Sequence, residues 1–421
     1  MALPATPVPV LFVEMSPYPS YGGTKVVLVN LMRGLDRTRF APHALVYRDG
    51  PWVTDLKALD VPVTIWTGHG LRPDAPTDGA PVAAATPQGA AVQTVNRRRL
   101  PLRQAAWELR AWARYFRQDV AAARRLAPLV PAGTRLIHVN YSLVHDCAWA
   151  RVARALHVPF VTHEHGIWRA RPAVWRHVAA RAASIICLTE ERVAQVRAAL
   201  GDRVHVDYVP NGVPTASLTP KRTRDAVRAE LGVAPGCALL VTAGHLQAWK
   251  GQALAVEAAV ALAARGVDFQ WLLCGGEVEA AYVTRLRARI AETRLGDRVR
   301  LLGQRFDLPD VFAACDLAVH TSIEPEPFGL VVVEAMLQGL PVVGPREGSI
   351  PSIVRDGVDG VLVAPRDAEQ LAAAIAALVV APERRLAMGR SGRQRVLDSF
   401  DSGLMAQRLE SVYDRTLADA S

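Results

Sequence analysis

The chain has few of the features that mark disulfide-rich, metal-binding or membrane-spanning proteins. Its five cysteines are odd in number and widely spaced among 421 residues, so neither a disulfide framework nor a zinc site is indicated. We expect them to be reduced core residues of a cytoplasmic protein. The longest weakly charged apolar run, 371–381, is far shorter than the ~20 residues that span a bilayer. The amino terminus also lacks the basic start and apolar middle of a signal peptide.

Acidic residues are outnumbered by basic ones, which gives a net charge of +9 and an isoelectric point near 9.7. Such a charge can serve nucleic acid, anionic lipid or anionic substrates. No zinc-finger, RRM or similar signature accompanies it, so we expect anionic small molecules or a membrane surface and no nucleic acid. The length predicts two or three domains, and half of the residues are hydrophobic, enough for sizeable cores.

The most informative stretch is 316–348, in which two carboxylates, Glu326 and Glu334, bracket a Pro-Phe-Gly turn. Pro327 disfavours a helical conformation at Glu326, and Gly329 allows the backbone to approach a ligand closely. A helix that begins near Gly329 would therefore direct its free N–H groups and its positive dipole end at an anion. The spacing predicts an anion site with a carboxylate on either side.

Carboxylates in these positions can accept hydrogen bonds from hydroxyls that flank a phosphate, as the sugar and the ribose of a nucleotide sugar do. The alternatives are a pair of surface glutamates and, for 331–333, a buried strand. The stretch resembles the Glu-x7-Glu motif of retaining glycosyltransferase family 4, which has the GT-B fold. The resemblance is carried by Glu326-Pro-Phe-Gly-Leu, Glu334-Ala and Gly339-x-Pro-Val-Val. It implies that Glu326 binds sugar hydroxyls, that Glu334 binds the ribose, and that the helix start at Phe328, Gly329 and Leu330 meets the diphosphate.

Near the amino terminus, an apolar run at 8–15 is followed by Gly22 and Gly23 and then by a helical pattern at 25–35. This order predicts a strand, a glycine turn and a helix. Doubly wound sheets bind ligands at such turns, and the glycines remove side chains that would exclude a phosphate. A plain tight turn is the alternative. The position matches the amino-terminal glycine loop of the family, which implies donor binding.

A second polar strand end is predicted at 159–166, where His163, Glu164 and His165 follow an apolar run. Polar groups that end a buried strand usually line a site. The resemblance implies that His165 faces the donor sugar. We expect His163 to point the other way and to be structural. No carboxylate or cysteine set completes a metal site around the two histidines, so no metal is expected.

The second sheet is predicted to start at 238 and to lead into a helix at 252–265. Lys250 precedes that helix, so its ammonium and the helix dipole could hold a diphosphate together. The family usually has an arginine where this chain has His245, and a histidine is mostly neutral at pH 7 and offers no bidentate fork. Arg305 is a further candidate for a contact with the nucleotide.

Between these regions, 68–96 is rich in Pro, Gly, Ala and Thr and predicts a mobile surface loop. The pattern at 97–126 predicts a basic amphipathic helix. Its arginines, including Arg110, Arg114 and Arg117, share one stripe, and apolar residues share another. The helix could bind an anionic membrane surface, although a solvated face on an ordinary domain helix is the alternative.

The resemblance implies a GT-B architecture of the α/β class, with two Rossmann-like doubly wound domains facing each other across a cleft. We expect an acceptor-side domain at 1–214, on which a helix at 397–421 packs back, and a donor-binding domain at 215–396. The implied activity is metal-independent, retaining transfer of a hexosyl unit from a UDP- or GDP-linked sugar to a glycan or lipid-linked glycan. His165, Glu326 and Lys250 would take part directly, without a cofactor.

Cell-surface polysaccharide or glycolipid synthesis is the expected setting, in the cytoplasm or on the inner face of its membrane. A nucleotide-sugar epimerase and a non-catalytic sugar-nucleotide-binding protein remain alternatives. A glycosidase is disfavoured, because Glu326 and Glu334 lie beside one anion site and need not flank a glycosidic bond.

Overall fold

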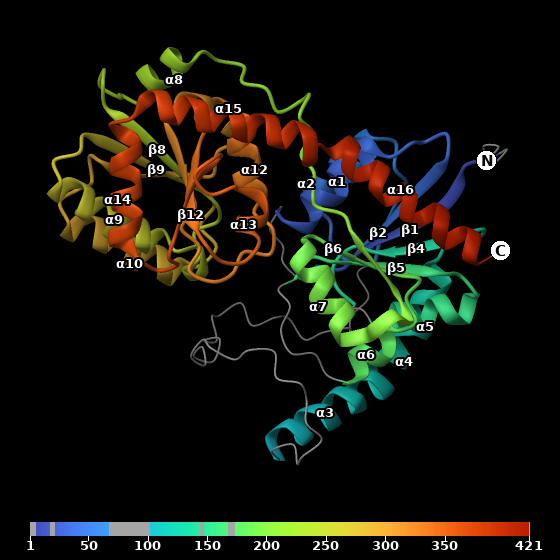
Figure 1. Cartoon of the computed structure of the whole chain (residues 1–421). Helices are drawn as coiled ribbons and strands as arrows, with labels where there is room; N and C mark the ends of the chain where they lie inside the picture. Colours follow the sequence, from blue (N-terminus) through green and yellow to red (C-terminus); the bar gives the residue numbers. More distant parts are fainter. Residues whose placement is uncertain (1–5, 17–21, 67–101, 144–146, 167–172, 421) are drawn as a thin grey trace. The chain divides into compact units, whose positions relative to one another are not determined.

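The computed structural model describes residues 6–16, 22–66, 102–143, 147–166 and 173–420 (Figure 1). The chain divides into two units. Unit 1 comprises Met1–Val209 and Ala406–Ser421, and unit 2 comprises Pro210–Met405. The expected domain borders, 214/215 and 396/397, lie five and nine residues from these. The predicted loop 68–96 and the first residues of the predicted helix 97–126 lie outside the described residues.

Unit 1 is built on a seven-stranded parallel sheet with the order β3-β2-β1-β4-β5-β6-β7. Its elements are β1 (Val8–Glu14), α1 (Thr24–Gly34), β2 (Phe40–Val46), α2 (Pro51–Ala58), β3 (Val63–Ile65), α3 (Leu102–Arg114), a π-helical turn (Tyr115–Asp119), α4 (Val120–Leu126), a 3-10 turn (Ala127–Leu129), β4 (Leu136–Val139), α5 (Cys147–Leu156), β5 (Phe160–Glu164), α6 (Ala173–Ala179), β6 (Ser184–Cys187), α7 (Glu190–Leu200), a 3-10 turn (Gly201–Arg203) and β7 (His205–Tyr208).

Strand β1 places buried apolar side chains on both faces of the sheet of unit 1. Successive side chains of a strand alternate between the faces. Leu11 and Val13 belong to a core cluster with residues of α4, α5 and α6. Phe12 points to the other face, where its ring lies 6.3 Å from that of Tyr413 on α16 (Ser402–Asp419). Because both faces are covered, apolar side chains occur at successive positions of the strand, as parallel sheets require.

Unit 2 has a six-stranded parallel sheet with the order β10-β9-β8-β11-β12-β13. Its elements are α8 (Arg224–Glu230), β8 (Ala238–Ala243), a 3-10 turn (Ala248–Lys250), α9 (Gln252–Ala264), β9 (Phe269–Cys274), α10 (Ala280–Glu292), β10 (Val299–Gly303), α11 (Leu308–Ala314), β11 (Leu317–Val319), α12 (Leu330–Leu337), β12 (Val342–Pro345), α13 (Ile350–Ile353), β13 (Gly360–Val363), α14 (Ala368–Val379), α15 (Pro382–Ser399) and the start of α16.

The core of unit 2 explains why the chain forms a helix where its valines alone would favour a strand. Val332 and Val333 of α12 are buried, and α12 packs against α15. Gly329, with φ +98°, is the N-cap residue directly before the helix. The expected helix start near Gly329 is therefore confirmed, and the strand alternative for 331–333 is wrong.

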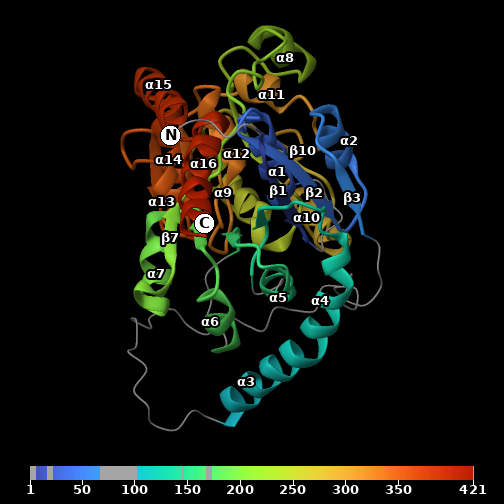
Figure 2. The same cartoon turned by 90° about the vertical axis from the view of Figure 1, so that its right-hand side faces the viewer.

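The segment after residue 101 is helical but does not form one regular amphipathic helix (Figure 2). The π-helical turn at Tyr115–Asp119 separates α3 from α4. A π turn adds a residue to one helical turn, so the two expected stripes do not continue unbroken through it. Leu109 and Phe116, two of the apolar residues of this segment, are 71% and 59% exposed. No helix in the described part of the chain is long and apolar enough to cross a bilayer.

Candidate functional site

The sheet of unit 2 changes direction of winding between β8 and β11, its two central strands. Ligands of doubly wound sheets bind beyond the carboxyl ends of the strands at such a point. The loop after β8 carries His245 and Lys250, and the loop after β11 carries Glu326. The topology therefore brings together side chains that lie 326 − 250 = 76 residues apart in the sequence.

Lys250 and Glu326 form an ion pair at this point. The Lys250 Nζ lies 2.7 Å from Oε2 of Glu326, and the two side chains are only 16% and 8% exposed. Ser322 Oγ donates a hydrogen bond of 3.1 Å to the same oxygen. His320 Nε2 is 3.3 Å from it but is not aligned for a hydrogen bond. Burial raises the pKa of Glu326, but the charge of Lys250 and the contacts with His320 outweigh it and hold this pKa far below its usual range.

Close backbone contacts fix the position of Lys250. Gly251 has φ +68°, and a Cβ atom there would lie 2.0 Å from the carbonyl oxygen of Thr321, so only glycine fits. Thr321 Oγ1 in turn donates to the carbonyl oxygen of Lys250 at 2.9 Å. The ammonium lies 4.0 Å from the centroid of the Trp249 ring, a favourable cation–π distance. The turn after β8 is thus joined directly to the loop after β11.

The loop that carries Glu326 is held from its other side by residues 348 and 349. Ser349 Oγ donates to the carbonyl oxygens of Glu326 and Phe328, at 3.0 and 2.5 Å. Gly348 has φ +66°, and a Cβ atom there would come within 2.5 Å of the Glu326 nitrogen. These contacts orient the carboxylate of Glu326 toward Lys250.

Helix α12 begins directly after this loop, and no side chain caps its amino end. The ring of Phe328 is buried and lies 5.9 Å from that of Phe400. A ligand at this helix start can therefore contact the backbone of Phe328, Gly329 and Leu330. Uncapped N–H groups at a helix start, close to an ammonium, form a binding place for phosphate.

Glu334 lies farther along α12 and is half-buried. Burial raises its pKa to about 7, and no cation among the described residues opposes that effect. No described residue donates a hydrogen bond to its carboxyl group. This group is therefore available to a ligand hydroxyl.

The other two candidates in unit 2 have different surroundings. Burial, and then the charge of Lys250, lower the pKa of His245, so its ring is neutral near pH 7. Arg305 follows the edge strand β10, two places from β8 in the sheet. Its guanidinium donates to both carboxylate oxygens of Asp307, at 2.8 and 2.7 Å, and to Glu230 at 3.2 Å. A nucleotide contact of Arg305 would have to compete with these acids, and it stays a prediction.

In unit 1, polar groups gather at the carboxyl ends of β1 and β4, the corresponding change of winding. Glu14 is buried and accepts hydrogen bonds from Asn140 Nδ2 at 2.7 Å and from Thr24 Oγ1 at 3.1 Å. Gly23, with φ +51°, precedes α1, and the Gly22 carbonyl accepts from the Lys25 N–H. The Gly22-Gly23 turn therefore lies between β1 and α1, as the sequence predicts.

His165 lies at the end of β5, and its backbone N–H donates to Tyr141. Its ring centroid is 4.2 Å from that of His163. The expectation that the two side chains point in opposite directions is wrong, because residues two apart on a strand share a face. Burial lowers the pKa of His163 to about 3 and that of His165 well below its usual value. Both rings are neutral, and the part of the chain that is described holds no group of three His, Cys, Asp or Glu suited to a metal ion.

Sequence reasoning missed three polar residues at these strand ends. His320 follows β11 next to Glu326, Ser322 bonds to the same carboxylate, and Asn140 follows β4 beside Glu14. His320 and Asn140 could have been found by the criterion that singled out His165, a polar residue directly after a buried strand. Ser322 lies farther along the loop and does not meet that criterion.

Comparison with known proteins identifies the family to which this architecture belongs. Residues 223–395 match the family of glycosyl transferases group 1. D-inositol 3-phosphate glycosyltransferase 1 of Catenulispora acidiphila is 30% identical over 328 residues, which cover 70% of this chain and 77% of that protein. The chain belongs to the family of glycosyl transferases group 1. The resemblance to glycosyltransferase family 4 is confirmed. Neither the matching family nor this relative is an epimerase.

A solved structure supports the fold. Anabaena HepE, in a complex with UDP and glucose, has a TM-score of 0.74 and 24% identity, and the alignment covers 97% of this chain and 99% of HepE. Both units are Rossmann-like, as GT-B glycosyltransferases require. The D-inositol 3-phosphate glycosyltransferase of Pseudarthrobacter chlorophenolicus is 34% identical, over 55% of this chain and 56% of that protein. The chain thus spans about half the length of the curated relatives it matches first.

Proposed function

We propose that this protein transfers a hexosyl unit from a UDP- or GDP-linked sugar, with retention of anomeric configuration, to a glycan or lipid-linked glycan. Cell-surface polysaccharide or glycolipid synthesis is the setting we propose. The observation that carries the proposal is the Lys250–Glu326 ion pair beside the uncapped start of α12, at the change of winding of unit 2. Membership of the glycosyl transferases group 1 family supports it.

In this proposal the diphosphate lies between the Lys250 ammonium and the first N–H groups of α12, at Phe328, Gly329 and Leu330. As the bond from the anomeric carbon to the phosphate oxygen breaks, negative charge grows on the diphosphate. Fixed donors that point at growing charge lower the barrier. Glu326 accepts hydrogen bonds from sugar hydroxyls, and His245 contributes as a neutral donor.

The other candidate residues are not cations, and we assign them to the uncharged parts of the donor. Glu334 binds the ribose hydroxyls. His165, in unit 1, uses a neutral ring to bind a hydroxyl of the donor sugar, and the Gly22-Gly23 turn admits a ligand closely. The acceptor hydroxyl attacks the anomeric carbon on the face that the diphosphate leaves, and its proton passes to the leaving phosphate. No protein general base is therefore assigned.

Metal independence is part of the proposal, since Lys250 and the helix start can supply the positive potential at the diphosphate. The expected result is equal transfer rates with and without EDTA, measured with dialysed protein. A rate restored only by Mg²⁺ or Mn²⁺ would contradict this part of the proposal.

The direct test of donor binding is thermal unfolding with UDP, GDP, ADP and their sugar conjugates. A ligand at 100 times its dissociation constant stabilises the folded state by about 2.7 kcal/mol, which shifts the midpoint by several degrees. A response to one base identifies the donor class, and NMR of the product then reports the anomeric configuration. No response to any nucleotide would contradict the proposal.

We also propose that the protein works on the inner face of the cytoplasmic membrane and binds it through the basic segment 97–126. Support comes from α3, where Leu109 and Arg110 are both exposed. Binding to anionic vesicles should weaken as salt is added and should be lost when Arg110, Arg114 and Arg117 are changed to Gln. Binding that is independent of salt would contradict it.

A further inference from the structure

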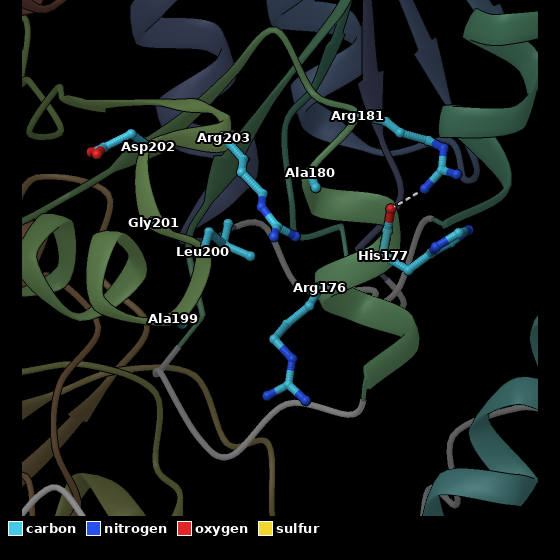
Figure 3. Close-up of a pocket in the computed structure, with 9 residues that line it drawn as sticks. All are labelled: Arg176, His177, Ala180, Arg181, Ala199, Leu200, Gly201, Asp202 and Arg203. Atoms are coloured by element: carbon cyan, nitrogen blue, oxygen red, sulfur yellow. Dashed lines mark hydrogen bonds between the residues drawn. The ribbon is translucent and has the colours of Figure 1, made fainter. Parts of the chain in front are cut away.

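Unit 1 has a hollow of about 590 Å³ between the ends of α6 and α7 (Figure 3). Its lining includes Arg176, His177 and Arg181 from α6 and the residues after it, and Leu200, Asp202 and Arg203 from the end of α7 and the turn that follows. Its volume falls in the range of small-molecule pockets. We call it the arginine pocket.

The arginine pocket is not part of the glycosyltransferase site. In a parallel sheet, a crossover helix runs antiparallel to its strands, so its carboxyl end lies at the amino edge of the sheet. The carboxyl ends of α6 and α7 are therefore at the edge opposite to that of Gly23 and His165. Ligands of the reaction bind at the carboxyl edge, which leaves the arginine pocket without an assigned ligand.

Most of the positive charge in the pocket has no acidic partner. Arg181 donates to the His177 carbonyl oxygen, the role of an arginine at a helix end. Arg176 and Arg203 form no ion pair or side-chain hydrogen bond with any described residue. Figure 3 shows the Arg203 side chain directed between the two helices. The lining thus contains three arginines and one acid, Asp202. Helix capping explains Arg181 and leaves the other two without a structural task.

A chain of ring contacts joins the arginine pocket to exposed apolar side chains. The His177 ring lies 5.3 Å from that of Trp112, which stacks on Phe116 at 5.7 Å. Phe116 is 59% exposed, and Leu109 and Trp107, which lie seven and nine residues earlier in the chain, are 71% and 42% exposed. Exposed apolar residues next to arginines are typical of segments that lie in a membrane interface.

We propose that the arginine pocket binds the phosphate headgroup of an anionic phospholipid while Leu109 and Phe116 enter the interface beside it. Guanidinium groups match phosphate oxygens in bidentate geometry. The neighbouring apolar side chains favour a lipid over a free phosphate, because a soluble ion gives them nothing to contact. This inference rests on the membrane part of the proposed function and adds to it a defined headgroup site.

The test compares two double variants of the full chain. Arg176→Gln/Arg203→Gln removes the two unpaired arginines of the pocket. Arg384→Gln/Arg390→Gln makes the same change of charge at exposed positions of α15 in unit 2. Binding is measured by co-sedimentation with vesicles of phosphatidylcholine alone and of equal parts phosphatidylcholine and phosphatidylglycerol.

We expect the pocket variant to bind the anionic vesicles about thirtyfold more weakly than wild type, since each arginine near an anionic surface contributes about 1 kcal/mol. The α15 variant should change binding less than about twofold, because its arginines do not line the pocket and long-range charge is screened. A UDP-induced shift of the unfolding midpoint in both variants shows that they are folded and that donor binding is intact.

Three outcomes would overturn the inference. Equal binding by the two variants would show that the pocket is not a headgroup site, although the membrane role could stand. No vesicle binding by wild type would remove both the membrane role and the headgroup site, while a UDP shift would leave donor binding in place. If glycerol 3-phosphate stabilises wild type but not the pocket variant, and vesicle binding is equal, the pocket serves a soluble phosphate.

Discussion

The carboxyl edges of the two sheets have the same topology but carry different groups. In unit 2 the edge carries a fixed ion pair, Lys250–Glu326, and an unpaired carboxyl group, Glu334. In unit 1 the edge carries neutral histidines, such as His165, and a carboxyl group, Glu14, that protein hydrogen bonds already satisfy. Burial raises the pKa of Glu14.

This difference indicates that the two units bind different parts of the substrates, although they share a fold. A charged diphosphate needs cations and free N–H groups, which unit 2 offers. Neutral rings and amides suit sugar hydroxyls, which bind without a change of charge. The predictions below alter one edge at a time.

The largest effect is expected at the ion pair of unit 2. Lys250→Ala and Glu326→Ala should each lower kcat/KM for transfer by about 10²- to 10³-fold, the usual cost of removing a fixed group that stabilises transition-state charge. The control is Glu277→Ala, which breaks an exposed pair with Arg287 and should leave the rate unchanged. Steady-state kinetics measure all three, and wild-type rates in the first two variants would refute their assignments.

For unit 1 we expect a loss of stability in acid that depends on its buried histidines. His163 has a folded pKa of about 3, below its unfolded value. The contribution of His163 to the free energy of unfolding is complete above pH 6.5 and is lost as pH falls toward 3. The loss is on the order of 3 kcal/mol by pH 4. Hydrogen exchange of β4 and β5 at pH 7 and pH 4 measures this.

The variant His163→Leu should remove the share of this dependence on pH that His163 contributes, whatever it does to stability at pH 7. The matched control is His205→Leu, since the His205 side chain is 59% exposed. If His163→Leu kept the full acid sensitivity of β4 and β5, the histidine would not be its source.

Unit 2 should show the opposite slope at Glu334. The folded pKa of about 7 is above the unfolded value of 4.5, so the folded state holds an extra proton between these values and loses stability as pH rises through them. Glu334→Gln should remove a penalty on the order of 2 to 3 kcal/mol at pH 8. It should also weaken binding of the nucleotide.

Hydrogen exchange of α12 from pH 4.5 to 8 tests this prediction. The control is Glu292→Gln, at a side chain that is 64% exposed. A Glu334→Gln variant with the same slope as wild type would show that the carboxyl group ionises freely in the folded protein.

The smallest effect is expected on the far side of the sheet of unit 1. Tyr413 Oη lies 2.6 Å from Nδ1 of His138, and both groups are buried. Tyr413→Phe should lower the free energy of unfolding by about 1 to 2 kcal/mol, because a buried hydrogen-bond partner is lost. Transfer by the folded variant should be unchanged, and urea unfolding with kinetics at a temperature well below the midpoint checks both.

Local signals were sufficient for the parts of the site that depend on the backbone. Gly329 correctly indicated where α12 begins, and the position of Lys250 before α9 could be read from the pattern. The pairing of Lys250 with Glu326 could not, because it depends on β8 and β11 being neighbours. Motif spacing within one segment contains no such information.

The predictions failed where the local backbone geometry or a competing hydrogen-bond partner determines the position of a side chain. His163 and His165 share a face, because side chains two positions apart on a strand point the same way. The π turn at Tyr115–Asp119 is invisible in a helical periodicity. The Arg305 guanidinium meets Asp307, two residues away, and Glu230, which is 305 − 230 = 75 residues distant. No pattern around Arg305 alone shows that second acid.

Helix α16 has a consequence for the order in which a ribosome-bound chain can fold. Unit 2 is continuous in sequence, whereas unit 1 needs Ala406–Ser421, which are synthesised after all of unit 2. Until Tyr413 arrives, Phe12, Phe40 and His138 lack the one ring that packs on all three of them. Unit 2 can therefore complete its fold while unit 1, although translated first, still exposes apolar surface of the kind that chaperones bind.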